Sequence, residues 1–399
     1  MPKPRILIAI HYLEIGGVET SLISLLDAWD YEKADIDLFV YSHRGEMMAH
    51  IPPQVTLLPE IKSYSLIESP IVRTIRNMRL GIAFGRYMAR RRHQSFLKHN
   101  PQTTGDSIYG YIGRHVTPWL PDINPSVTYN LAISFLTPHD IVLRKVKARK
   151  KICWIHTDYS SIGHDARLEH PVWAAYDHIA SISPAVTKGF LSHHPSLSDK
   201  IIGINNILSP TLIRTRADEF IPSEMDRGSF TILSVGRLSQ PKNFENIPAI
   251  TSSIISITGL TDLRWYIVGY GGMEQEIRDA IDAAGMQDHV ILLGKRENPY
   301  PYIKHCDLYV QPSRYEGRSV TVREAQILGR PVVVTAYPTS YDQIDHLADG
   351  VIVPLDNDGC ASGIASVISD KALLESLSST CLSRDYSDSR EVEKIYRLL

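Results

Sequence analysis

Short runs of apolar, mostly β-branched residues alternate along the chain with longer segments that mix apolar and charged positions. In the first half these runs are RILIAIHY (5–12), DIDLFVYS (35–42), YNLAISF (129–135), KKICWIHTDY (150–159) and HIASIS (178–183). Because their apolar residues are largely consecutive, the runs are typical of strands that helices cover on both faces. The pattern therefore predicts βα units built on a parallel sheet.

A second series of runs follows the polar stretch SEMDRGS (223–229). It consists of FTILSVGRL (230–238), LRWYIVGYG (263–271), HVILLG (289–294), DLYVQPS (307–313), RPVVVTAY (330–337) and GVIVPLD (350–356). Two series predict an α/β fold with two Rossmann-like, doubly wound domains that face a central cleft. We expect the domains at 1–208 and 209–380, and a C-terminal helix at 381–399 that packs back toward the first domain. Functional residues are expected in strand-to-helix loops, where such sheets bind ligands.

The composition narrows the class of protein. Of 399 residues, 43% are hydrophobic and 22% are charged, which is typical of a globular chain. The net charge of −2 gives no general reason to expect a nucleic-acid partner. The four cysteines form no Cys-x-x-Cys pair, which argues against a disulfide framework or a zinc site and fits a reducing cytosol. The apolar runs are shorter than the about 18 to 20 residues of a membrane span, so we expect a cytoplasmic chain that does not cross a bilayer.

Two glutamates stand out in SRYEGRSVTVREAQILGRP (313–331). Ser319 is a plausible N-cap and Gly329 a plausible stop, so Glu316 lies in a loop before a helix and Glu324 lies inside it. The N–H groups at a helix start favour an anion such as phosphate, and the flanking carboxylates accept hydrogen bonds from sugar hydroxyls. Taken alone, the two residues are explained equally well without a ligand, with Glu316 as a turn cap and Glu324 as a solvated helix residue.

Two cations follow another predicted strand, in SVGRLSQPKNF (234–244). The fork-shaped guanidinium of Arg237 and the point charge of Lys242 together suit a diphosphate. A solvated surface pair is the alternative. Four ligand-type residues on the loops of one sheet edge favour the binding site.

Several segments then resemble, in order, the signatures of one family. They are GRLSQPKNF (236–244), IVGYGGMEQEI (267–277), GKRENPYPYIKHCDLYVQPSRYEG (294–317) and EGRSVTVREAQILGRPVVVT (316–335). Together they resemble the retaining family 4 glycosyltransferases with the GT-B fold, of the bacterial capsular and surface-polysaccharide type. The spacing Glu-x7-Glu is the family's mark.

The resemblance implies a role for each matching residue. Arg237 and Lys242 would bind and neutralise the donor diphosphate in place of a metal, Glu324 would contact the nucleotide ribose, and Glu316 would hold hydroxyls of the donor sugar. The remaining expected contacts are main-chain N–H groups at Arg318, Ser319 and Val320 for phosphate, and Lys295, Arg296 and Asn298 near the base. Arg318 departs from the commonest family pattern, which leaves the identity of the donor sugar open.

The first half agrees less specifically with this family. Gly16 and Gly17 follow the first strand, where glycine lets a backbone approach a phosphate. A plain tight turn explains them equally, although in the family this loop touches the donor diphosphate. His156 ends a strand, where a lone histidine is more often structural. The family uses a histidine here near the reacting carbon of the sugar, and Asp158 is a weaker candidate for an acceptor contact.

A basic stretch runs from residue 69 to residue 105 without an acidic residue. Its eight cations are Arg73, Arg76, Arg79, Arg86, Arg90, Arg91, Arg92 and Lys98. They alternate with apolar residues at near-helical spacing, which favours an anionic membrane surface. A solvated helical face and an anionic glycan acceptor are the alternatives.

These features predict a metal-independent retaining glycosyltransferase, peripheral on the inner face of the cytoplasmic membrane. It would take a sugar from a nucleotide-diphosphate donor, with UDP preferred, and pass it to a glycan acceptor, lipid-linked in surface polysaccharide assembly. The resemblance implies no cofactor and no protein nucleophile, so the acceptor hydroxyl would attack from the leaving-group side and a phosphate oxygen would take its proton. Two alternatives are a soluble transferase that makes a storage glucan or small glycoside, and a non-catalytic subunit that binds a sugar nucleotide or glycan.

Overall fold

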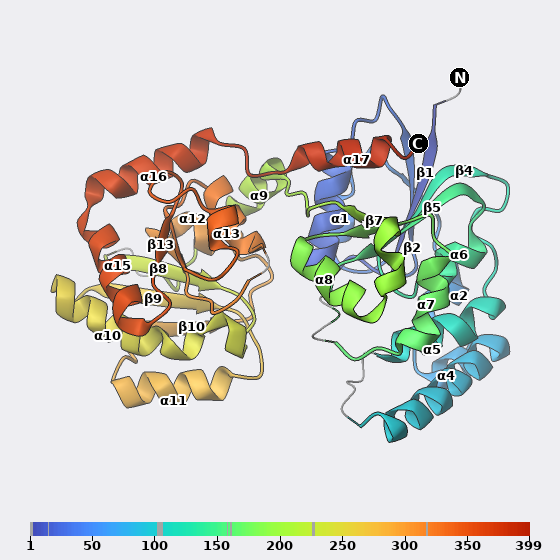
Figure 1. Cartoon of the computed structure of the whole chain (residues 1–399), viewed down its shortest axis with the longest axis horizontal. Coiled ribbons are helices and arrows are strands. Elements are labelled where there is room, and N and C mark those ends of the chain that lie inside the picture. Colours follow the sequence, from blue (N-terminus) through green and yellow to red (C-terminus); the bar gives the residue numbers. More distant parts are fainter. Residues whose placement is uncertain are drawn as a thin grey trace. The chain divides into compact units, whose positions relative to one another are not determined.

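The computed structural model describes residues 3–14, 16–101, 107–157, 159, 162–225, 228–316 and 318–399. It divides the chain into two compact units (Figure 1). The N-terminal unit comprises Met1–Ile207 and Asp388–Leu399, and the C-terminal unit comprises Leu208–Ser387. Each unit is a parallel sheet with helices on both faces, which confirms the predicted α/β fold class.

The N-terminal unit contains a seven-stranded sheet in the order β3-β2-β1-β4-β5-β6-β7. Its strands are β1 (Arg5–Ile10), β2 (Asp35–Val40), β3 (Thr56–Leu57), β4 (Tyr129–Ser134), β5 (Ala148–Ile155), β6 (His178–Ser181) and β7 (Ile201–Gly203). Its helices are α1 (Gly17–Asp27), α2 (Lys62–Ser65), α3 (Ile71–Arg76), α4 (Leu80–His99), α5 (Ile108–Val116), α6 (Asp140–Lys145), α7 (Ala166–Ala174), α8 (Pro184–His193) and α17 (Val392–Tyr396). The order reverses between β1 and β4, and such a switch point opens a crevice at the carboxyl ends of the strands.

The C-terminal unit contains a six-stranded sheet in the order β10-β9-β8-β11-β12-β13. Its strands are β8 (Phe230–Val235), β9 (Leu263–Val268), β10 (Val290–Gly294), β11 (Leu308–Gln311), β12 (Val332–Thr335) and β13 (Val351–Val353). Its helices are α9 (Pro210–Ala217), α10 (Ile247–Thr258), α11 (Glu274–Ala284), α12 (Tyr300–His305), α13 (Val320–Ile327), α14 (Ser340–Gln343), α15 (Asn357–Ser369) and α16 (Lys371–Ser383). The switch here lies between β8 and β11, the strands that precede the predicted cationic and acidic loops.

The central strands are buried on both faces, as their unbroken apolar runs predict. Ile6 to Ile10 in β1 and Val332 to Val334 in β12 are each 0% exposed. Their side chains alternate between the two helical layers, so both layers receive apolar surface from every strand.

The end of the chain differs from the expected single helix at 381–399. Helix α16 continues to Ser383, and a short helix, α17, covers only Val392–Tyr396. Helix α17 belongs to the N-terminal unit, where the Tyr396 ring lies 4.8 Å from that of Trp29 and Lys33 pairs with Glu393 at 2.7 Å. The two helices are separated by irregular residues and a 3-10 turn at Ser389–Glu391, and Arg384 in this segment pairs with Asp345 and Asp349 at 3.1 and 3.0 Å.

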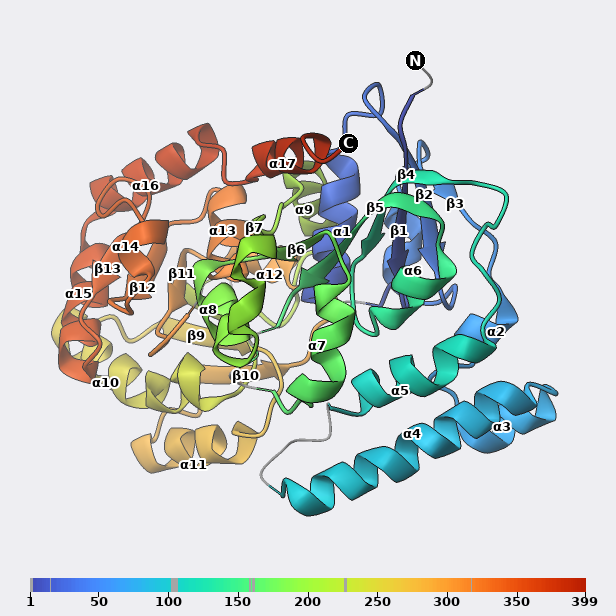
Figure 2. The ribbon, with the colours of Figure 1, turned by 45° about the vertical axis from the view of Figure 1, so that its right-hand side comes forward.

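Helices α3, α4 and α5 form an outer layer of the N-terminal unit (Figure 2). Helix α5 packs along α4, and α3 contacts the start of α4. Over much of their length, α3 and α4 therefore each have one face exposed to solvent. Among the described residues, no helix has both the length and the hydrophobicity needed to cross a membrane.

Candidate functional site

Two strand-to-helix loops of the C-terminal unit meet at the carboxyl edge of its sheet. One follows β8 and carries Lys242 in a 3-10 turn, and the other follows β11 and carries Glu316. Lys242 Nζ donates to Glu316 Oε1 at 2.5 Å, and the two side chains are 20% and 12% exposed. The contact joins residues 74 positions apart because β8 and β11 are neighbouring strands.

A chain of hydrogen bonds from β11 fixes the Glu316 carboxylate. Tyr309 Oη donates to Gln311 Oε1 at 2.9 Å, Gln311 Nε2 donates to Ser313 Oγ at 2.9 Å, and Ser313 Oγ donates to Glu316 Oε1 at 2.7 Å. Tyr309, Gln311 and Ser313 are all buried, so water does not compete for these bonds. The carboxylate is therefore held in one orientation before any ligand binds.

Arg314 ties the same two loops together at a second point. Its main-chain N–H donates to Pro241 O at 2.8 Å, and its guanidinium donates to Gln240 O at 2.7 Å and pairs with Glu245 at 2.6 Å. Arg237 lies on the β8 loop with its side chain exposed, and it forms no ion pair with the residues that the structure describes. The β8 loop thus carries one cation that is paired with a carboxylate, Lys242, and one that is exposed to solvent, Arg237.

Glu324 is buried in α13 and is not a solvated helix residue, which excludes that alternative. Its side chain is 5% exposed, and its Oε1 accepts a hydrogen bond from Tyr300 Oη at 2.9 Å. Burial raises the pKa of Glu324 to about 7, although the Tyr300 bond and the charges of Arg323 and Arg216 act to lower it. A buried carboxylate with one protein donor retains the capacity to accept further hydrogen bonds from a ligand.

We predict that Glu324→Gln stabilises the protein in a pH-dependent way while weakening nucleotide binding. The raised pKa means that the folded state binds more protons than the unfolded state between about pH 4.5 and pH 7, so native stability falls as pH rises through this window. Above it the ionised Glu324 costs at most on the order of 3 kcal/mol, which glutamine removes. Chemical denaturation at pH 5 and pH 8 should show a larger stabilisation at pH 8, and calorimetry at pH 8 should show nucleoside-diphosphate affinity lowered by roughly tenfold or more.

The control for this prediction is Glu276→Gln, on the exposed face of α11. It should change neither the stability difference between the two pH values nor the affinity. A stabilisation by Glu324→Gln that is equal at pH 5 and pH 8 would contradict the ionisation argument.

Asn298 has a structural role in the surroundings of Glu324. It is 6% exposed, and its Nδ2 donates to Arg216 O and to Glu219 Oε2, both at 2.7 Å. Its Oδ1 accepts the Tyr300 N–H at 3.1 Å, at the start of α12. Asn298 therefore positions Tyr300, and through it Glu324, while its expected contact with a base stays a prediction.

Lys295 and Arg296 lie on the same loop after β10 but have separate partners. Lys295 Nζ lies 5.4 Å from the ring centroid of Tyr270, which is 57% exposed. Arg296 pairs with Glu224 at 2.9 Å and lies over the ring of Tyr302. Both remain predicted contacts of the base, and the exposed face of Tyr270 is a further candidate that the sequence reading missed.

Helix α13 begins at Val320 with Ser319 at its N-cap, as predicted. The Ser319 side chain does not cap the helix. Instead, the Ser319 N–H donates to Gln343 Oε1 at 2.9 Å, and Gln343 Nε2 donates back to Ser319 O at 2.7 Å. A phosphate that used the Ser319 N–H would have to displace this amide, whereas the roles of Arg318 and Val320 stay predictions.

Four predicted site residues belong to the N-terminal unit, namely Gly16, Gly17, His156 and Asp158. Gly16 lies at the N-cap of α1 with an extended backbone (φ −164°), and a side chain on Gly17 would meet open space. Neither position has a backbone conformation that requires glycine, so a tight turn does not explain the two glycines. Close approach of a ligand is the explanation that is left. Asp158 lies outside the described residues.

His156 follows β5 and stacks on Trp154, with ring centroids 5.8 Å apart and an interplanar angle of 8°. Burial lowers its pKa to about 3, while a backbone hydrogen bond at Phe135 acts to raise it. The ring is therefore neutral at physiological pH. Its Nε2 is buried and has no partner among the described residues, so it can contact a hydroxyl as donor or acceptor.

The described residues contain no group of three or more His, Cys, Asp or Glu side chains that could hold a metal ion. The four cysteines are free and buried. The Asp-x-Asp sequence at Asp35 and Asp37 belongs to β2, where Asp37 is 1% exposed and pairs with Arg5 at 2.9 Å.

Comparison with known proteins agrees with this architecture. Residues 216–381 match the family of glycosyl transferases group 1. A Campylobacter jejuni relative, N-acetylgalactosamine-N,N'-diacetylbacillosaminyl-diphospho-undecaprenol 4-alpha-N-acetylgalactosaminyltransferase, is 29% identical over 146 residues, or 36% of this chain and 38% of its own. The Escherichia coli UDP-Gal:alpha-D-GlcNAc-diphosphoundecaprenol alpha-1,3-galactosyltransferase is 24% identical over 222 residues, or 55% of this chain and 50% of its own. The chain thus spans half or less of the length of these relatives.

The fold comparison extends over the whole chain. The crystal structure of Anabaena HepE in complex with UDP and glucose aligns with a TM-score of 0.61 at 14% identity, covering 98% of this chain and 97% of that one. The chain has the GT-B fold, which confirms the fold that the resemblance implied. The part of the chain that is similar to group 1 glycosyl transferases, residues 216–381, lies in the C-terminal unit.

Proposed function

We propose that the chain is a retaining glycosyltransferase that transfers a sugar from a UDP-linked donor to a lipid-linked glycan. The observation that carries this proposal is the Lys242–Glu316 pair at the β8–β11 edge, which sets a cation beside a fixed carboxylate. A donor's diphosphate and sugar need these two groups side by side, since phosphate oxygens seek cations and sugar hydroxyls seek carboxylates. The buried Glu324 adds a third anchor, suited to ribose hydroxyls.

The proposed mechanism depends on stabilising the negative charge of the leaving diphosphate. As the bond between the sugar and the diphosphate breaks, negative charge grows on the leaving phosphate, and Lys242 and Arg237 stabilise it without a metal. Glu316 holds the sugar hydroxyls, and neutral His156 is the predicted contact near the reacting carbon. The acceptor hydroxyl attacks from the leaving-group side and gives its proton to a phosphate oxygen, so the configuration is retained.

The acceptor proposal draws on relatives and on one surface. The two bacterial relatives are named for diphospho-undecaprenol-linked substrates. In this chain α3, α4 and the turn between them expose a set of large apolar side chains, namely Val72, Ile75, Met78, Leu80, Phe84 and Tyr87, and the exposed Trp119 ring lies next to Phe84. Several large apolar side chains exposed on one helical segment are typical of a lipid or partner contact.

The same segment carries the predicted basic residues. Seven of the eight predicted basic residues are exposed, and they form no ion pair with described residues: Arg73, Arg76, Arg79, Arg90, Arg91, Arg92 and Lys98. The eighth, Arg86, is not a surface cation as predicted, because it turns inward and donates to Ile67 O. Gly81 permits the arrangement, since a Cβ there would come within 2.3 Å of the Trp119 ring. Together the apolar and basic side chains fit the interface of an anionic membrane, where the lipid carrier lies.

The test is nucleotide release by the purified protein across UDP-, GDP- and ADP-sugars, without acceptor and with and without EDTA. We expect slow release from a UDP-sugar that EDTA does not change, together with calorimetric binding of UDP. Release only in the presence of a divalent cation would overturn metal independence. Absence of binding by every nucleotide would favour the non-catalytic subunit, and transfer to a soluble glucan rather than a lipid-linked glycan would favour the storage-glucan alternative.

A further inference from the structure

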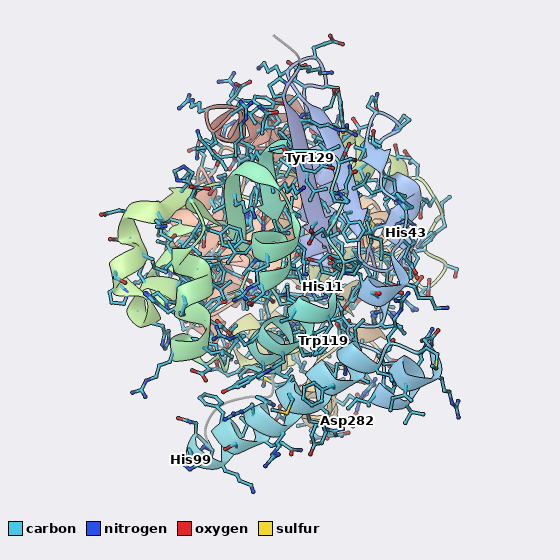
Figure 3. The ribbon with its side chains drawn as sticks, turned by 90° about the vertical axis from the view of Figure 1, so that its right-hand side faces the viewer. His11, His43, His99, Trp119, Tyr129 and Asp282 are labelled. Atoms are coloured by element: carbon cyan, nitrogen blue, oxygen red, sulfur yellow. The ribbon has the colours of Figure 1, made fainter. Side chains whose placement is uncertain are left out.

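A polar pocket lies in the N-terminal unit at the carboxyl end of β1 and β2. It is lined by His11 and Tyr12, which follow β1, by Tyr41 and Arg44, which follow β2, and by residues of 64–73, which run from the end of α2 into α3. Figure 3 shows His11 at the end of the sheet opposite Tyr129, the first residue of β4. The cavity of about 230 Å³ is smaller than the roughly 300 to 1,000 Å³ of pockets for drug-sized ligands, so it suits one sugar ring rather than a nucleotide.

Two buried polar atoms in this pocket lack a protein partner. His11 is 6% exposed, and its Nδ1 is 2.8 Å from Glu68 Oε1, which leaves Nε2 without a partner among the described residues. Tyr41 is 2% exposed, and its hydroxyl likewise has no described partner. Buried polar groups are satisfied in the great majority of cases, so these two atoms point to hydrogen bonds with a ligand.

The pocket has a carboxylate in its interior and an exposed cation at its rim. Burial acts to raise the pKa of Glu68, but the His11 bond and the charges of Arg44 and Arg86 outweigh it, so the pKa is lowered and the carboxylate is ionised at neutral pH. Arg44 lies over the Tyr12 ring at 4.5 Å, near the carboxylate. Arg73, in contrast, is exposed on α3 and has no ion pair with described residues. The interior therefore accepts hydroxyl donors, and the rim attracts an anion.

We propose that this pocket, resting on the transferase function proposed above, binds the acceptor's sugar ring together with the phosphate attached to it. Glu68, His11 and Tyr41 bond the ring hydroxyls, and Arg73 holds the phosphate. Strand pairing places His11 level with Ile155, so His156 lies two strands away, about 10 Å along the same sheet edge. Arg73 belongs to the helix that exposes Val72 and Ile75, so the anionic end of the acceptor would meet the protein beside the lipid surface.

The experiment measures binding of hexose and N-acetylhexosamine 1-phosphates to the full chain by saturation-transfer NMR and calorimetry. Free sugars and inorganic phosphate are the other arms. One sugar 1-phosphate should bind at least tenfold more tightly than its free sugar or phosphate, because only it engages both the interior and the rim. Equal binding by phosphate alone would overturn the sugar subsite, and absence of binding by every probe would overturn the pocket.

Two variants locate the binding. Tyr41→Phe removes only a hydroxyl and should weaken binding roughly 3- to 10-fold, whereas Arg73→Gln, on the surface, should weaken it roughly tenfold or more and remove the preference over the free sugar. Tyr31→Phe is the matched control, because the Tyr31 hydroxyl donates to Leu26 O away from the pocket. Unchanged affinity in both variants would place the ligand elsewhere and overturn the proposal.

UDP binding by the same protein keeps this proposal separate from the proposed function. If UDP binds and no sugar phosphate does, the pocket proposal falls and the transferase proposal stands. If a sugar phosphate binds with the expected variant effects and no nucleotide does, the transferase proposal falls and the pocket is a glycan-binding site.

Discussion

Replacing Lys242 with alanine is expected to lower sugar transfer by roughly 100- to 1,000-fold at saturating donor, the usual range for removing one stabiliser of transition-state charge. Negative charge grows on the leaving phosphate during the reaction, so Lys242 contributes more to the transition state than to the bound donor. The loss should therefore appear in kcat more than in KM. Lys242→Arg keeps the charge but not the compact ammonium, and it should fall between the wild type and the alanine variant.

Lys242 also neutralises Glu316, and this structural role has its own control. The double variant Lys242→Met with Glu316→Gln removes both charges, so it restores the stability that an unpaired, mostly buried carboxylate would cost. Because Glu316 is itself proposed to hold the donor sugar, the readout is affinity for UDP, which carries no sugar. If Lys242 only balances Glu316, the double variant recovers UDP affinity relative to Lys242→Ala; if Lys242 holds the diphosphate, UDP affinity stays low. Lys371→Ala, an exposed lysine on α16, should leave turnover unchanged. Turnover by Lys242→Ala within a few-fold of the wild type would remove the phosphate role.

The second large effect concerns the membrane. Changing Arg76, Arg79 and Arg91 together to serine should lower affinity for anionic vesicles roughly 100-fold at low salt, from about 1 kcal/mol for each cation near the lipid. The wild type should lose affinity as salt rises, because exposed charges are screened over about 10 Å at 0.1 M ionic strength. Co-sedimentation with vesicles of phosphatidylglycerol and phosphatidylcholine, across a salt series, measures both changes.

Matched substitutions separate this surface from total charge. The triple variant of Lys147, Arg149 and Arg167 to serine removes the same charge from other exposed sites of the N-terminal unit and should keep vesicle affinity within about threefold. Phe84→Ser with Trp119→Ser should weaken binding at every salt concentration, since it removes apolar contact rather than charge. No binding of the wild type at low salt, or equal losses in the two charge variants, would show that α3 and α4 are a solvated face.

The features that depend on neighbours in the chain could be predicted from the sequence. Consecutive apolar residues predicted the buried parallel strands, and capping residues with a terminal glycine placed Glu316 before α13 and Glu324 within it. Such signals are local because strand burial and helix ends are governed by residues a few positions apart. Pattern reading also found the exposed basic helices, but it could not see that Arg86 turns inward to bond Ile67 O.

Only the tertiary structure decided which residues meet and how far each is buried. The pairing of β8 with β11 brings Lys242 onto Glu316, and the packing of α12 against α13 sets Tyr300 on Glu324 and raises the pKa of that carboxyl group. The same holds for the unpartnered His11 and Tyr41 atoms, whose sequence neighbours give no sign of a pocket. Burial and partner choice depend on elements far apart in the chain, so sequence periodicity predicts which elements form, whereas their packing decides which side chains are available for chemistry.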